Sequence, residues 1–515
     1  MTQQLLTYAI TAPGFYGLNT QDSSLDLATG FALTATNCVI DQYGRIGARK
    51  GWTPNHSASG VLGSEDVKSI GELITVDGTS WTICAGNNKL FKLVGSTLTE
   101  LTYGGGGTAP TITASNWQMA SLGGGLYLFQ EGHDPLEFNP TTSTTQYRRI
   151  SEMAGYAGTV QKGNAVISAY GRLWNVGTTT DKVTIQWCDT KQPYDWAAGL
   201  AGSLDTTTVW PKGGDSVVGL GAHNGFLFVF GKNNILIYSG ATDPSASTFA
   251  LQDVITGIGC ISRDTIANTG SDIIFLSQTG VRSLQRTIQE KSAPLRELSK
   301  NIRNDLLNYI AIETAANIKA IHSPLDAFYL LTLPSSRQVY CFDTKASLQD
   351  GSARVTMWDS IAPTSFCVKQ DGTLLMGKAG YVATYSGYLD NTANYLLQYH
   401  TNHTDFGAPS VASILKTLLV TVVGGNGQAL TFKWAYDFTG NFYSQNVNIP
   451  PNNIAYYGES DYNDSDYSSG QVLSILKAYP TGSGKVVQTG YEAYINGSPL
   501  SIQKIEIFAK NGKIT

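Results

Sequence analysis

Short apolar runs recur along the chain, and each is bounded by glycine, asparagine or aspartate. In the stretch 223–244, the runs 226–230 and 235–238 flank a polar turn at 231–234. Aromatic and β-branched runs that end at such turns predict β-hairpins. The same plan begins again at spacings of 45, 47, 53, 47, 55 and 46 residues, near Trp81, Leu126, Leu173, Phe226, Ile273, Phe328 and Leu374.

A near-constant period of about 50 residues indicates stacked supersecondary units. A four-stranded sheet of that length cannot bury both of its faces alone, so such units pack around an axis as the blades of a β-propeller. We therefore predict an all-β fold with a propeller over residues 56–390. The pattern favours seven blades, with six as the alternative, and a β-sandwich is the competing architecture.

One interval of the repeat is longer, and its residues follow a helical period. Between 293 and 321 apolar residues recur in steps of 3, 4, 4 and 4: Leu295, Leu298, Ile302, Leu306 and Ile310. These steps place the residues on one face of a helix. Ser292 is the expected N-cap, because Pro294 then falls in the first turn, where proline is tolerated. We predict a short helix inserted between two blades near 293–321.

The two ends of the chain lack the repeat. Within residues 1–55, a strand turns at 41–44 and continues through Arg45, Arg49 and Lys50. Residues 391–515 contain two predicted hairpins, 412–438 with a turn at 424–427 and 491–514 with a turn at 496–497. We expect 391–515 to form a separate β platform that 1–55 completes, since the first and last blades of a closed ring are neighbours.

Composition supports a turn-rich β protein and restricts its function. Charged residues are 14% of the chain, and 55 residues are glycine. A net charge of −5 without a basic cluster argues against a surface that grips nucleic acid through phosphates. The 6 cysteines include no CxxC pair, so we expect free buried thiols and synthesis in a reducing cytoplasm. We also expect no signal peptide and no membrane insertion.

Two motifs resemble chemical sites but lack what the chemistry needs. The stretch 481–487 (TGSGKVV) lacks the first glycine and the final hydroxyl of a phosphate loop. His400, His403 and Asp405 could bind a metal if they lay on a helix, but their neighbours predict an extended or looped segment.

Three further motifs are equally incomplete. The acidic run 461–466 lacks the glycine and glutamate of an EF-hand loop. Asp77 stands in an incomplete sialidase-type turn, and Trp358-Asp359 is a solitary WD dipeptide. We therefore expect no catalytic residue, no metal site and no cofactor.

Residues 12–52 contain the run Asn-x-Val-x-Asp-x-x-Gly-x-Ile-x-x-Arg-x-Gly, from Asn37 to Gly51. This stretch, together with residues 399–416 and 500–514, resembles the tail nozzle (tail tubular B-type) proteins of short-tailed bacteriophages. The resemblance implies a virion protein without catalytic residues, with a propeller and an added platform. It implies a homohexameric ring below a tail adaptor protein that also meets tail fibres or spikes. Phage DNA would leave through the lumen without sequence-specific binding.

The leading expectation is therefore a structural, non-enzymatic protein of a phage tail, made in the host cytoplasm. We expect Arg45, Arg49 and Lys50 to make subunit contacts, with a solvated strand face as the alternative. A receptor-binding or scaffold propeller is the second candidate. The third is a carbohydrate-active propeller enzyme, which would carry acidic and aromatic side chains at the mouth of the propeller.

Overall fold

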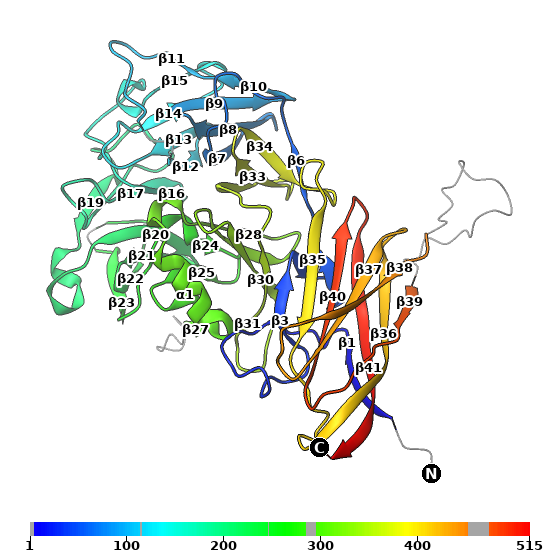
Figure 1. Cartoon of the computed structure of the whole chain (residues 1–515). Helices are drawn as coiled ribbons and strands as arrows, with labels where there is room; N and C mark the ends of the chain where they lie inside the picture. Colours follow the sequence, from blue (N-terminus) through cyan, green and yellow to red (C-terminus); the bar gives the residue numbers. More distant parts are fainter. Residues whose placement is uncertain (1–4, 114–115, 246, 285–294, 452–472, 515) are drawn as a thin grey trace.

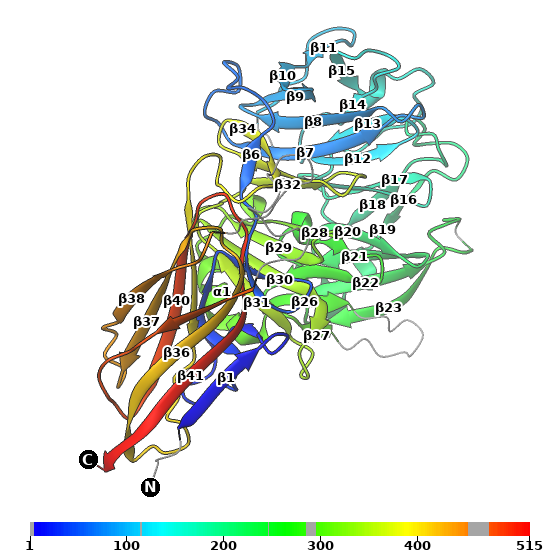
Figure 2. The same cartoon turned by 90° about the vertical axis from the view of Figure 1, so that its right-hand side faces the viewer.

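The computed structural model describes residues 5–113, 116–245, 247–284, 295–451 and 473–514. Six small sheets and one end of a ten-stranded sheet form a ring of seven blades, and a platform, made of the rest of that sheet and a six-stranded sheet, extends from one side of it (Figures 1 and 2). The inner strands of successive sheets contact one another, and the inner strand of the last sheet contacts that of the first. The prediction of an all-β propeller is confirmed, and the closed ring has seven blades.

Each blade has four strands that follow one another outward from the axis. The inner strands are β7 (Val67–Ile74), β12 (Gln118–Leu122), β16 (Ala165–Ala169), β20 (Val217–His223), β24 (Ala267–Asn268), β28 (Lys319–Ser323) and β32 (Ser365–Val368). The second strands are β8 (Ser80–Gly86), β13 (Gly125–Phe129), β17 (Arg172–Val176), β21 (Phe226–Gly231), β25 (Ile273–Ser277), β29 (Phe328–Leu333) and β33 (Leu374–Lys378). The third strands are β9 (Lys89–Val94), β14 (Leu136–Phe138), β18 (Thr184–Trp187), β22 (Asn234–Ser239), β26 (Gly280–Leu284), β30 (Gln338–Ser347) and β34 (Tyr381–Tyr385). The outer strands are β10 (Thr97–Glu100), β15 (Gln146–Arg149), β19 (Gly202–Asp205), β23 (Ala250–Thr256), β27 (Leu295–Glu297), β31 (Ala353–Trp358) and β6 (Trp52–Pro54), and β11 (Thr102–Tyr103) adds a parallel strand to β15.

The apolar runs that define the repeat in the sequence are the second strands of the blades. Strands β13 and β25 are buried along their full length, because the neighbouring blades cover both faces of each sheet. Asn224 and Gly225 join β20 to β21 with φ of 50° and 82°, the left-handed conformation that a two-residue hairpin turn requires. The repeat in the sequence therefore reflects two requirements of each blade: a buried second strand and a tight turn beside it.

The last blade is closed by a strand from the beginning of the chain. β6 pairs antiparallel with β34, so that Thr53 lies opposite Thr384. The strand Trp52–Pro54 thus lies in the propeller, although the sequence placed it in the N-terminal platform segment 1–55. The strand that precedes blade 1 can pair with blade 7, because the first and last blades of a closed ring are neighbours.

The platform is a sandwich of two sheets. The first contains β39 (Leu473–Ala478), β36 (Val411–Gly424), β41 (Leu500–Ile514), β1 (Leu6–Thr11), β5 (Ile46–Ala48) and β4 (Cys38–Ile40). The second contains β2 (Gly17–Leu18), β3 (Phe31–Thr36), β35 (Tyr395–Thr401), β40 (Val487–Ile495), β37 (Ala429–Tyr436) and β38 (Tyr443–Asn448). Fully buried residues such as Leu418 and Ile505 from the first sheet pack with Phe432 and Tyr491 from the second. N-terminal and C-terminal strands thus share one hydrophobic core.

The second platform sheet is continuous with blade 6. Strand β31 pairs with β2 at Val355 and Gly17 and with β3 at Met357 and Thr36, which makes one sheet of ten strands. Gly17 has a φ of 82°, and a Cβ there would lie 2.4 Å from the Val355 carbonyl oxygen. Only glycine allows this approach without a backbone shift. The propeller and the platform are therefore joined through main-chain pairing.

Both predicted hairpins of the C-terminal region are wrong. The turn at 424–427 joins β36 to β37, and the turn at 496–497 joins β40 to β41, but each pair of strands lies in two different sheets. Alternating apolar residues specify which side chains are buried, and they do not specify the partner strand. Each turn crosses the sandwich, so the apolar faces of the two strands meet in the core.

The predicted helix is shorter than 293–321. The helix α1 (Arg303–Ala311) follows a 3₁₀ turn at Lys300–Ile302, whereas 295–297 form β27 and 319–323 form β28. β27 is the outer strand of blade 5 and β28 is the inner strand of blade 6, and their pairing overrides the helical period at both ends. Ile302 and Leu306 are fully buried, as the apolar stripe predicts. The expected N-cap at Ser292 lies outside the described residues.

Candidate functional site

Arg49 lies at the joint between the propeller and the platform and is fully buried. Its Nη1 and Nη2 donate to Asp390 Oδ1 and Oδ2 at 2.8 and 2.7 Å. Nε donates to Asn37 Oδ1 at 3.1 Å, Nη1 also donates to the Lys50 carbonyl at 2.9 Å, and Nη2 donates to Ser360 Oγ at 2.6 Å. These five bonds use the full donor capacity of a guanidinium group.

The guanidinium also lies over the ring of Tyr395, with Cζ 4.0 Å from the ring centroid. The hydroxyl of Tyr395 donates to the carbonyl of Arg49, and burial raises the pKa of this phenol, so it remains a donor at neutral pH. A planar group that stacks and donates in a fork suits this position, and a lysine could not reproduce it. The contacts hold Arg49 in one orientation.

Asn37 supports Arg49 from the loop between β3 and β4. Its φ is 53°, and asparagine is one of the few residues that adopt this left-handed conformation readily. Its Nδ2 donates to Asp359 Oδ1 at 2.7 Å and to the Leu396 carbonyl at 2.8 Å. The side chain thus connects the end of blade 6 to strand β35 of the platform.

The solitary WD dipeptide also belongs to the joint. Trp358 is fully buried, its Nε1 donates to the Cys38 carbonyl at 2.9 Å, and its ring stacks on Tyr385 at a centroid distance of 5.6 Å. Tyr385 comes from blade 7, so one side chain contacts two blades and the platform. Sequence analysis missed this role, since a single dipeptide carries no sign of its partners.

A glycine permits the closest backbone contact at the joint. A Cβ on Gly51 would lie 1.8 Å from the Leu389 carbonyl oxygen, and the Gly51 amide donates to Gly387 at 3.0 Å. The chain that enters the propeller at Gly51 therefore runs directly beside the chain that leaves it. Arg49 contacts three parts of the molecule. Ser360 follows the last strand of blade 6, Asp390 lies in the loop after blade 7, and Tyr395 begins a strand of the platform.

The expectation that Arg49 makes a subunit contact is wrong, because its donors are used within the chain. Lys50 forms an ion pair with Asp326 at 2.9 Å and its side chain is 44% exposed. Arg45 lies over the ring of Tyr43 at 4.3 Å, next to the turn between β4 and β5. A role of Arg45 and Lys50 between subunits stays a prediction.

The two histidines of the candidate metal motif point to different partners. His400 Nε2 lies 2.9 Å from Glu492 Oε1, and Glu492 also accepts from Lys433 at 2.7 Å and from Gln398 at 2.9 Å. Burial opposes ionisation of Glu492, but the hydrogen bonds from these three residues outweigh it and lower its pKa to about 2. His403 instead packs against another ring, outside this network.

The other chemical motifs have structural roles in the part of the chain that the structure describes. Residues 481–487 lead into strand β40 rather than into a helix, and Asp77 accepts from Thr75 and Thr79 within a hairpin turn. The acidic run 461–466 lies outside the described residues. In the described part of the chain, no three metal-ligating side chains converge on one point. All six cysteines are free thiols. None of the described helices is long and apolar enough to cross a membrane.

A second charged cluster lies near the axis of the propeller, where the inner strands begin. Lys319 pairs with Asp264 at 2.5 Å, and Arg263 donates to Asn164 Oδ1 at 2.7 Å and to the Asn116 carbonyl at 2.6 Å. Burial lowers the pKa of Lys319, while the Asp264 carboxylate opposes this effect. The cluster connects the segments that lead into four different blades. Sequence analysis did not single out these residues, since nothing in their spacing indicates that they meet.

No family model matches this chain. No curated protein sequence matches it either. Among solved structures, it is similar to the WD40 domain of Neurospora crassa Pan2, with a TM-score of 0.41, 10% identity, and coverage of 65% of this chain and 96% of that one. It is also similar to Kuenenia stuttgartiensis hydrazine synthase (TM-score 0.40, 11% identity, coverage 64% and 97%) and to the extracellular domain of BT4673 from B. thetaiotaomicron (TM-score 0.39, 12% identity, coverage 67% and 41%). These likenesses concern the fold alone and imply no function.

Proposed function

We propose that this chain is a structural, non-enzymatic protein of a short bacteriophage tail. Six copies form a ring below the tail adaptor protein, fibres or spikes dock on it, and phage DNA passes through the lumen without sequence-specific contacts. The proposal rests on the resemblance of residues 12–52, 399–416 and 500–514 to tail nozzle proteins.

One observation supports the proposal most directly: the resembling run Asn37–Gly51 builds the joint. Asn37 and Arg49 hold the buried hydrogen-bond network, and Gly51 allows the close chain crossing. Asp41 Oδ1 accepts from the amides of Tyr43 and Arg45 at 2.8 and 3.0 Å and fixes the turn. These residues fix the backbone of the joint and show no catalytic arrangement. A structural, non-enzymatic ring subunit needs such a fixed shape.

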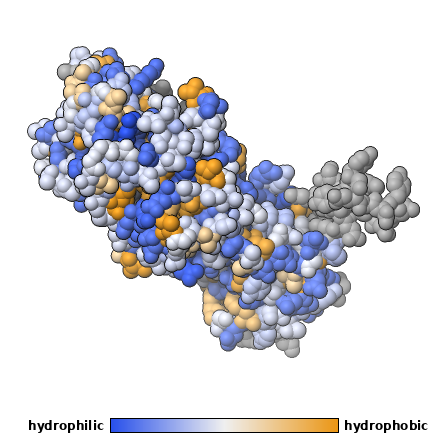
Figure 3. Space-filling model, turned by 90° about the horizontal axis from the view of Figure 1, so that it is seen from above, coloured by the Kyte–Doolittle hydropathy of each residue, from blue (hydrophilic) through white to orange (hydrophobic). Residues whose placement is uncertain are grey.

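The exposed surface is compatible with contacts of mixed chemistry. On the face seen in Figure 3, apolar residues lie in small groups among polar ones. A large apolar patch would drive association in solution, so a face with only small apolar groups is consistent with subunits that assemble on a partner. Rings of identical subunits close through heterologous contacts.

Cryo-electron microscopy of purified particles tests the proposal. We expect sixfold density of this fold below the adaptor, and mass spectrometry of the same particles should detect the chain. Particles that lack the chain, or that carry it without rotational symmetry, would refute the tail role. In the assembled tail, Arg45→Glu should weaken ring formation, and Lys212→Glu, a change at an exposed residue between blades 3 and 4, serves as the matched control.

A further inference from the structure

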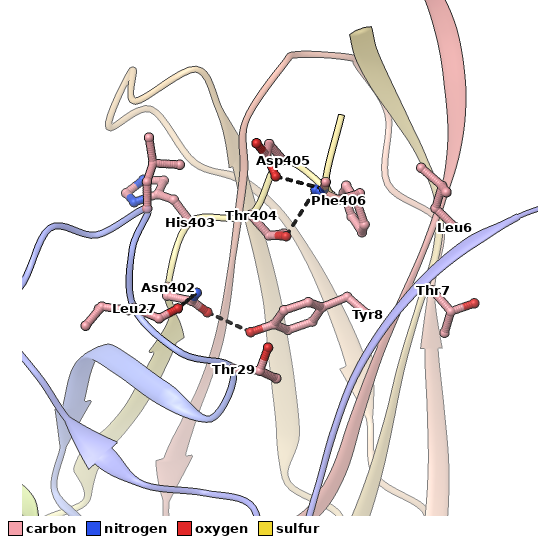
Figure 4. A pocket seen from close by; sticks show the side chains of 12 residues that line it. Leu6, Thr7, Tyr8, Leu27, Thr29, Asn402, His403, Thr404, Asp405 and Phe406 are labelled. Atoms are coloured by element: carbon pink, nitrogen blue, oxygen red, sulfur yellow. Dashed lines mark hydrogen bonds between the residues drawn. The ribbon is translucent and has the colours of Figure 1, made fainter. Parts of the chain in front are cut away.

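A polar cavity of about 350 Å³ lies in the platform, at the seam between its two sheets. Strand β1 of the first sheet forms one wall, and the loop 402–407, which follows β35 of the second sheet, forms the opposite wall (Figure 4). We call it the seam cavity. It lies away from the joint, and its binding of a ligand can be tested on the isolated chain, apart from the proposed tail function.

The back of the seam cavity is fixed by buried hydrogen bonds. The hydroxyl of Tyr8 donates to Asn402 Oδ1 at 2.6 Å, and Asn402 Nδ2 donates to the Leu27 carbonyl at 3.0 Å (Figure 4). Asn402 is 4% exposed, so its side-chain bonds are largely shielded from water. A site whose walls are set before binding loses little entropy when a ligand enters.

The loop wall presents polar groups that are held by its own backbone. Asp405 Oδ1 accepts from the Gly407 amide at 2.8 Å, and Thr404 Oγ1 accepts from the Phe406 amide at 3.2 Å. Phe406 has a φ of 54°, which turns the chain sharply at this point. The carboxylate retains a second oxygen, and the threonine hydroxyl retains its proton for donation.

His403 borders the seam cavity as an uncharged ring. Its Nδ1 is shielded from solvent and is therefore closed to a ligand in the cavity, and its ring packs on Phe438 with 4.7 Å between the ring centroids. Burial lowers the pKa of His403, so the ring adds no positive charge to the cavity at pH 7.

The charges and the size of the seam cavity define the ligand class. Its described lining contains one carboxylate and no lysine or arginine, so an anion would find no counter-charge. Hydroxyls and a carboxylate beside the rings of Tyr8 and Phe406 suit a ligand that has many hydroxyl groups and an apolar face. The volume is near the lower end of the range of about 300–1,000 Å³ for small-molecule sites. We propose that the seam cavity binds a single neutral sugar unit, with Asp405 as the main hydrogen-bond acceptor.

Ligand-observed saturation-transfer NMR on the full chain tests this proposal. The probes are the methyl glycosides of glucose, galactose, N-acetylglucosamine and rhamnose, and n-butylammonium is the competing cation. We expect saturable transfer to at least one glycoside with a Kd on the order of 1 mM, a typical value for a few weak polar contacts. Asp405→Ala should weaken binding about tenfold or more, because a hydrogen bond to a charged group is lost.

Two variants separate binding from folding. Asp405→Asn keeps an oxygen for the Gly407 amide, so the loop should stay in place while sugar affinity falls less than in Asp405→Ala. Asp371→Ala is the matched control, since Asp371 accepts from the Thr373 amide at 2.8 Å in a similar turn on blade 7. Transfer to no glycoside, transfer unchanged in both Asp405 variants, equal loss in Asp371→Ala, or binding of n-butylammonium alone would overturn the proposal.

Discussion

Replacing Arg49 by methionine tests whether the joint holds the propeller and the platform together. The change leaves Asp390, whose side chain is only 9% exposed, without its bidentate partner. Breaking a buried ion pair from one side costs about 3–5 kcal/mol, because the remaining carboxylate stays desolvated and unpaired. We expect Arg49→Met to lower the free energy of unfolding by that amount.

The same loss can be expressed as a change in melting temperature. At about 2.1 cal/mol/K per residue, the 515 residues give an unfolding entropy of about 1.1 kcal/mol/K if the chain unfolds as one unit. The expected drop in Tm is then about 3–5 °C by calorimetry. Removing the stranded charge as well, in Arg49→Met/Asp390→Leu, should restore part of the loss.

The matched control is Lys89→Met. Lys89 also binds a carboxylate, that of Glu100, but the two side chains are 41% and 36% exposed. Exposed pairs contribute about 0–1 kcal/mol, so Tm should fall by less than about 1 °C. Equal drops for Arg49→Met and Lys89→Met would refute the reasoning that burial gives the joint its strength.

Three further changes probe other parts of the structure. Lys319→Met removes the 2.5 Å partner of Asp264 but leaves Arg263 Nε 3.5 Å from the same carboxylate, so we expect a loss in urea unfolding that is smaller than the roughly 3–5 kcal/mol of a fully unpaired charge, and an unchanged midpoint would contradict the role of the axial cluster. Glu492 has a folded pKa of about 2 against 4.5 for the free group, so its contribution to stability is complete above pH 4.5 and is lost as the pH falls toward 2. Glu492→Gln should therefore flatten the acid side of the stability curve, and a curve parallel to that of the wild type would argue against the network. Gly51→Ala forces the backbone away from Leu389 and should cost about 1–3 kcal/mol, whereas Gly60→Ala, where a Cβ meets nothing within 4 Å, should be nearly neutral.

The propeller could be predicted from the sequence because its signals are local. Each blade combines an apolar second strand with turns such as Asn224-Gly225, and both are legible within a few residues. The platform could be predicted only in part. Its strands were found, but β36 and β37 lie in different sheets, because alternation defines a buried face and leaves the pairing open.

The residues of the sites could not be predicted for the same reason. Arg49 looks like an exposed strand residue until Asp390 and Ser360, more than three hundred positions later, are brought beside it. The small residues near it, Ala48 and Gly51, are a local feature of the sequence that is consistent with close packing around Arg49. The sequence pointed to two residues of the seam cavity, His403 and Asp405, but only as a possible metal site. Tyr8 could not be added to them, because its position depends on the pairing of β1 with β41.

The chain path through the joint has a consequence for biosynthesis. Strands β1 to β5 are made first, yet most of their partners in the platform, β35 to β41, are made last. Ribosomes add about 5–20 residues per second, so roughly 20–70 s separate the two halves while the propeller emerges between them. For that time the apolar sides of the early strands lack their platform partners, which exposes the growing chain to aggregation.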